Sequence, residues 1–236
     1  MIKRILVLVI ALQFVGCAEL QNVVNQVSTS GVLSDAQIGN GLREALDNGI
    51  KNQVSKLTAT DGFYKNDLVK IVLPEELQAV DNGLRKLGLG NLADEGIKAL
   101  NRAAEDAVKT ATPIFVDAVK DMTFADAKNI LLGDQNAATS YLQVKTTESL
   151  TASFSPVIKS SFDKVGADQV WSNLITKYNS IPFVKKVNPD LTQYVTEQAL
   201  LGVFTMIEVE EKGIRESVGL RDTALLKQVF ALQDNK

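Results

Sequence analysis

Apolar residues recur along most of this chain at the three- and four-residue spacing of an amphipathic helix. The spacing places them on one face, which a folded protein turns toward its core. Ser34 with Gln37 matches a capping box at the start of the first such pattern. The apolar stripe that follows this capping box comprises Ile38, Leu42, Ala45, Leu46, Ile50, Val54 and Leu57.

Similar patterns predict further helices at 74–88, 93–122, 123–133, 134–166, 170–178, from 191 onward and at 223–232. Pro113 interrupts the second of these, and its missing N–H and bulky ring favour a kink or a break there. The stretch 199–207 is apolar on every side, which predicts a helix buried all round. One β-branched stretch at 69–73 precedes Pro74 and is predicted to be extended. The fold class is therefore mainly α: a single compact multi-helix domain with at most one short extended segment.

The first residues differ from the rest and have the anatomy of an export signal. Lys3 and Arg4 precede an apolar run that is too short to span a bilayer, which needs roughly 20 apolar residues. Residues 14–17 (FVGC) resemble the bacterial lipobox, in which the signal is cut before the cysteine and its thiol receives a diacylglycerol. The resemblance predicts a signal peptide at 1–16, an acylated N-terminus and flexible tether at 17–32, and one helical domain at 33–236.

Lipidation of Cys17, with a diacylglycerol and a further acyl chain such as palmitate, would give a stable anchor, because two or more chains hold a protein firmly. Ala18 follows the cysteine where an inner-membrane protein would carry aspartate, so by resemblance to known sorting rules we expect the periplasmic face of the outer membrane of a Gram-negative bacterium. An ordinary secretory signal with an incidental cysteine, or an uncleaved start, remains the alternative.

Composition removes much catalytic chemistry. The 236 residues include no histidine and one cysteine, which excludes Ser-His-Asp and Cys-His nucleophiles, the HExxH zinc site and an internal disulfide. A balance of 25 basic and 28 acidic residues gives a net charge of −3 and argues against a nucleic-acid partner. We expect no metal and no cofactor.

Two polar groups lie on predicted helices. Asn101 and Glu105 border a face of small residues, while Arg102 points away, beside Asp106. Near the C-terminus, Glu208 with Lys212 and Glu211 with Arg215 are i,i+4 pairs, which predicts a solvated helix end. These residues are interpreted either as packing partners or as a polar pocket at a helix crossing. The candidate pocket comprises Asn101, Arg102, Glu105, Glu211, Arg215 and Arg221. Arg221 stands just before Asp222 and Thr223 and is expected to pair with one of the C-terminal acids at a helix start.

Several short motifs together resemble a bacterial lipoprotein family known as domain of unknown function 4197. The resemblance covers nearly all of the chain after Cys17 and implies an exported, mostly helical lipoprotein. It implies no catalytic residues, because the family has no assigned activity. The motifs stand at 41–46 (GLREAL), 61–63 (DGF), 70–74 (KIVLP), 101–105 (NRAAE), 113–115 (PIF), 126–127 (DA), 130–133 (ILLG), 138–141 (ATSY) and at Glu211, Ile214 and Arg215.

Three functions follow as hypotheses. The first is a membrane-tethered, non-enzymatic module that binds an envelope protein or supports the envelope. The second is a carrier of an apolar, lipid-like ligand held between helices near Ala103 and Ala104. The third is a histidine-free hydrolase that uses carboxylates such as Glu105, Glu208 or Glu211. The sequence favours the first, and does not identify the partner.

Overall fold

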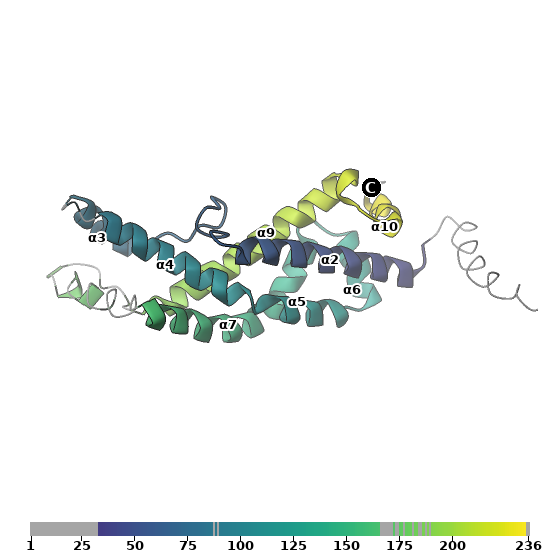
Figure 1. Ribbon diagram of the computed structural model, residues 1–236. Coiled ribbons are helices and arrows are strands. Elements are labelled where there is room, and N and C mark those ends of the chain that lie inside the picture. Colours follow the sequence, from purple (N-terminus) through teal and green to yellow (C-terminus); the bar gives the residue numbers. More distant parts are fainter. Residues whose placement is uncertain are drawn as a thin grey trace, which may run out of the picture.

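The computed structural model describes residues 33–165 except 87 and 89, scattered positions between 172 and 188, and residues 190–234. The predicted signal peptide, Cys17 and the tether lie outside the described residues, as does most of the predicted helix at 170–178. The described part is built from helices packed into an elongated bundle (Figure 1). The mainly α fold predicted from the hydrophobic pattern is therefore confirmed.

The long helices run side by side through the middle of the bundle, and α3 and α10 lie toward opposite ends (Figure 1). Helix α7 packs along both α4 and α9, and α2 contacts α5, α6, α9 and α10. One continuous apolar core joins these elements. The helices are α2 (Asp35–Thr58), α3 (Glu75–Lys86), α4 (Gly90–Val108), α5 (Ala111–Lys120), α6 (Phe124–Leu131), α7 (Ala137–Val165), α9 (Thr192–Glu216), the 3-10 turn η1 (Val218–Leu220) and α10 (Ala224–Asp234).

Helix boundaries follow local chemistry that the sequence already carries. Ser34 caps α2 through the backbone N–H of Gln37, and Thr123 caps α6 through that of Asp126, so both capping boxes are complete. The predicted break near Pro113 is confirmed between α4 and α5. The proline sits in the first turn of α5, where its missing N–H would have had no intrahelical acceptor.

Helix α9 corrects one prediction. The apolar stretch 199–207 was expected to be buried all round, yet Leu201 is 58% exposed while its neighbours Leu200 and Gly202 are buried. The reason is that α9 packs on α2, α4 and α7, which leaves one of its faces to solvent. None of the helices in the described ranges is both long and apolar enough to cross a membrane.

Candidate functional site

The residues of the predicted polar pocket fall into two groups on different helices. Asn101, Arg102 and Glu105 lie on α4 and face the chain that follows α2; we call them the α4 cluster. Glu211 and Arg215 lie near the end of α9, and Arg221 lies just after it; we call these the α9 cluster. The two clusters occupy separate parts of the bundle (Figure 1), so the structure does not bring all six residues together.

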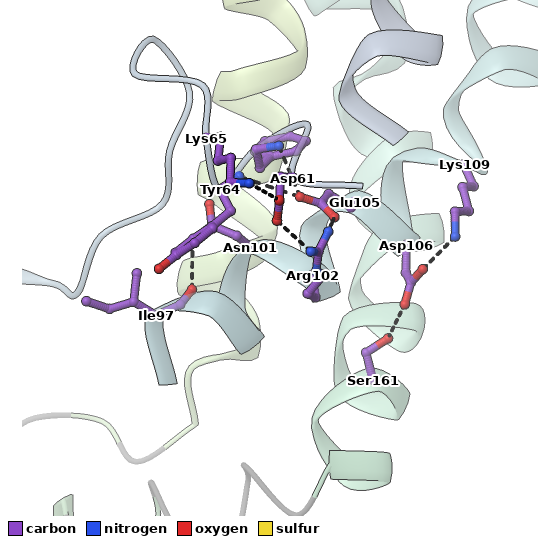
Figure 2. A network of polar contacts seen from close by, with 11 residues as sticks. Asp61, Tyr64, Lys65, Ile97, Asn101, Arg102, Glu105, Asp106, Lys109 and Ser161 are labelled. Carbon is purple, nitrogen blue, oxygen red and sulfur yellow. Dashed lines mark hydrogen bonds and ion pairs between the residues drawn. The ribbon is translucent and has the colours of Figure 1, made fainter. Parts of the chain in front are cut away.

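Glu105 holds the turn that ends α2. One carboxylate oxygen accepts hydrogen bonds from the backbone N–H groups of Phe63 at 3.1 Å and Tyr64 at 3.5 Å. The other oxygen accepts from Arg102 at 2.5 Å (Figure 2). Glu105 is 4% exposed, so these internal partners replace the water that the carboxylate would otherwise bind.

The same turn needs an unusual backbone, which Asp61 and Gly62 supply. Asp61 has a φ of +67°, in the left-handed region that aspartate tolerates better than most residues. A Cβ on Gly62 would lie 2.4 Å from the carbonyl oxygen of Lys56, so only glycine fits. Arg102 binds the Asp61 carboxylate at 2.5 Å and Lys65 binds it at 2.8 Å, which fixes the turn against α4 (Figure 2).

Asn101 takes the place of a β-strand partner. The extended segment was predicted at 69–73, but Val69 belongs to the preceding turn, where its N–H donates to the Asn66 carbonyl. Residues 70–73 have no paired strand among the described residues. Instead, the Asn101 carboxamide accepts from the Ile71 N–H at 2.8 Å and donates to the Ile71 carbonyl at 2.8 Å. It also donates to the Ile97 carbonyl at 2.7 Å. Asn101 and Ile71 are buried, so one side chain satisfies both backbone groups of a residue that has no ladder.

Arg102 differs from its predicted position. It was placed on the outside of α4 beside Asp106, whereas its guanidinium turns back to Glu105 and reaches across to Asp61. Asp106 pairs with Lys109 instead, at 2.7 Å. The helical wheel gives the direction of the Cα–Cβ bond only, and a side chain as long as arginine can fold back over an adjacent turn toward an acid.

The α9 cluster joins two helix ends through one ion pair. Glu211 accepts from the backbone N–H groups of Ala138 at 2.9 Å and Thr139 at 2.8 Å, in the first turn of α7, and from the Thr139 hydroxyl at 2.8 Å. Arg215 donates to the carbonyls of Ile130 at 2.8 Å and Leu131 at 3.1 Å, at the end of α6. An acid thus caps a helix N-terminus and a base caps a C-terminus, as the helix dipoles favour.

The pairing of Glu211 with Arg215 is confirmed at 2.8 Å, but its setting is not the predicted one. The two side chains are 6% and 2% exposed, whereas the sequence pattern indicated a solvated helix end. The correction has a simple cause: the end of α6, the first turn of α7 and Gln233 of α10 all contact these two side chains and bury them. Glu208 and Lys212, one turn away on the more open side, form the predicted surface pair.

Arg221 ties the last helix to the end of α9. It donates to the carbonyls of Ile214 at 3.0 Å and Arg215 at 2.8 Å, and binds the Asp234 carboxylate at 2.5 and 2.9 Å. Its guanidinium also lies 5.4 Å from the ring centre of Phe230. The sequence suggested that Arg221 pairs at a helix start with one of the α9 acids. Its partner is Asp234 at the far end of α10, which no local spacing could reveal.

The polar side chains of both clusters thus have their partners within the chain. That either cluster binds a ligand remains a prediction from the sequence. An apolar hollow lies beside the α9 cluster, between α2, α9 and α10, with a volume of about 30 Å³, close to that of one water molecule. Within the described ranges, no group of three Asp, Glu or Cys side chains is arranged to hold a metal ion.

The α4 cluster makes a prediction about acid stability. The Lys65 ammonium, with Arg102, holds the pKa of the Asp61 carboxyl below its usual range. A lowered pKa contributes stability that is complete above the unfolded-state value and is lost as pH falls through the folded-state value. We expect the melting temperature to drop as pH is lowered from about 5 to about 2, and to drop less in Asp61→Asn, because asparagine keeps the left-handed backbone without the charge. Parallel slopes for the two proteins would contradict the assignment.

Comparison with known proteins identifies the family of this chain. A family model described as "Protein of unknown function (DUF4197)" matches residues 32–231, which is most of the chain. The matched range includes both polar clusters. No curated protein and no solved structure matches the chain. The protein therefore belongs to the DUF4197 family, as the ordered series of short motifs predicted.

Proposed function

We propose that this protein is a lipid-anchored, non-enzymatic component of the bacterial envelope. In this proposal Cys17 attaches it to the periplasmic face of the outer membrane, and the helical domain acts by contact with another envelope component. The non-enzymatic part of the proposal rests on one observation: both oxygens of each buried carboxylate already have partners within the chain. Glu105 and Glu211 each bind two backbone N–H groups and an arginine. Such carboxylates fix the fold and have no oxygen free for a substrate.

The packing of α4 favours this proposal over an apolar-ligand carrier. The small residues Ala103, Ala104 and Ala107 are 0–1% exposed, and they belong to the core where α4 meets α7 and α9. The face of α4 where the sequence suggested a bound ligand is therefore filled by closely packed helices. The hollow beside the α9 cluster is far smaller than the roughly 300 Å³ of a small-molecule site. A larger hollow of about 310 Å³ lies between α7 and α9, but polar side chains such as Gln193 and Glu197 make up most of its lining, which does not suit an apolar ligand.

The anchor is tested by Cys17→Ala in the native host. We expect the variant to lose acyl labelling and to move from the membrane fraction to the soluble fraction, because the cysteine sulfur is the attachment point of the lipid. Ala18→Ser is a matched control, which retains the cysteine and should stay in membranes. Unchanged fractionation of Cys17→Ala would show that the lipid-anchor proposal is wrong.

The partner is tested in the same cells. A photo-crosslinking residue at the exposed position 201 should give one adduct of reproducible mass with the anchored protein, and the same residue at the exposed position 147 on α7 serves as the comparison. A protein that is always recovered alone, from both positions, would contradict the contact function while leaving the anchor intact.

A further inference from the structure

Aromatic and apolar side chains are exposed at the end of the bundle where the described chain begins. Phe124, the first residue of α6, is 48% exposed, and Val144 on the outer side of α7 is 84% exposed. Tyr141 lies one turn before Val144 and is partly buried. We call these three residues the Phe124 face. A Cβ on Gly39, in the second turn of α2, would lie 2.6 Å from the Phe124 ring, so this face adjoins the start of α2.

Each ring of the Phe124 face has a cation beside it. The Arg43 guanidinium lies 5.3 Å from the ring centre of Phe124, and the Lys145 ammonium lies 5.8 Å from that of Tyr141. Aromatic rings flanked by long cationic side chains suit the headgroup layer of a bilayer, where the ring enters the apolar boundary and the charge meets phosphate. Asp121 and Asp126 also face Tyr141, so net positive charge is not the attraction. The attraction between this face and the bilayer therefore has to come from insertion of its apolar side chains.

The length of the tether restricts which surface the anchored bilayer can meet. The sixteen residues from 17 to 32 separate the lipidated cysteine from the described chain. Sixteen residues reach at most about 53–58 Å, and a flexible coil of that length would have a root-mean-square span of about 20–24 Å. Helix α2, with its 24 residues, is about 36 Å long. The Phe124 face is therefore closer along the chain to Cys17, and on average closer to the anchored bilayer, than the exposed Leu68 and Val72, which follow the distant end of α2.

We propose that the Phe124 face rests on the phospholipid bilayer that holds Cys17, with the Phe124 and Val144 side chains at headgroup depth. The inference depends on the proposed lipid anchor and adds the orientation of the domain to it. A few apolar side chains bind a bilayer weakly on their own. The tether keeps them close to the surface, so that the contact becomes intramolecular and is populated.

Site-directed spin labelling of the full acylated protein tests this orientation. The sulfur of an acylated Cys17 is a thioether, so an introduced cysteine is the only free thiol in the chain. Labels at Phe124→Cys and Val144→Cys are compared with labels at Leu68→Cys and Val72→Cys, in vesicles of phosphatidylethanolamine and phosphatidylglycerol. The accessibility of each label is measured by its collisions with a water-soluble nickel complex and with oxygen, which dissolves in the bilayer. We expect the labels at 124 and 144 to lose most of their collisions with nickel and to gain collisions with oxygen. We expect the labels at 68 and 72 to stay accessible to nickel.

The outcomes separate the orientation from the anchor. If the protein floats with the vesicles and all four labels stay equally accessible to nickel, or if only the labels at 68 and 72 are protected, the proposed orientation is wrong. If the acylated protein fails to float, the anchor itself is wrong and the orientation falls with it. Val144 is largely exposed, so its label keeps the test valid even where a substitution at Phe124 disturbs packing against α2.

Discussion

Glu211→Ala is expected to lower the free energy of unfolding by about 3–5 kcal/mol, the range found when one partner of a buried ion pair is removed. The variant leaves Arg215 as an uncompensated charge that is 2% exposed, and it removes the acceptor of two N–H groups at the start of α7. Chemical denaturation followed by circular dichroism measures the loss.

The matched control for this prediction is Glu216→Ala, which removes an exposed acid from the same helix and should change stability by no more than about 0.5 kcal/mol. The double variant Glu211→Leu/Arg215→Met should recover part of the loss, because it removes the stranded charge as well. Equal effects of Glu211→Ala and Glu216→Ala would contradict the structural role given to the buried pair.

Asn101→Leu is expected to destabilise the protein by about 2–4 kcal/mol, since each buried backbone group left without a partner costs about 1–3 kcal/mol. Leucine branches at the same carbon as asparagine but cannot bind the N–H or the carbonyl of Ile71. We expect the loss of structure to begin locally, in the segment around Ile71. Hydrogen exchange at Ile71 should therefore accelerate more than exchange in the middle of α7.

Asn91→Leu provides the comparison, because Asn91 lies on the same helix and is exposed. It should leave both global stability and exchange at Ile71 unchanged. If Asn101→Leu proved as stable as the native protein, the view of Asn101 as a substitute strand partner would be wrong.

The helices were predictable from the sequence because their signals are local. The stripe along α2, the caps at Ser34 and Thr123, and the break before Pro113 each depend on residues a few positions apart. The exposed Leu201 was missed because apolarity on every side does not say which side a neighbouring helix will cover.

The sequence predicted which residues belong to the polar clusters, but not which groups those residues contact. Asn101, Glu105 and Glu211 stood out as polar groups on apolar helices, yet the backbone N–H groups that they bind lie 30 to 73 residues away along the chain. Spacing within one helix carries no information about such partners. The same limit explains why the Glu211–Arg215 pair was found while its burial was not, and why Arg102 and Arg221 were assigned other neighbours.

The central proposal is that the protein works as a helical framework held to a membrane through one sulfur atom, with its buried charges serving the fold. Intact mass spectrometry of the protein purified from the membranes of its host tests this most directly. The proposal predicts a chain that begins at Cys17 and carries a diacylglycerol and a further acyl chain. A chain that begins elsewhere, or one with a free thiol at Cys17, would contradict it.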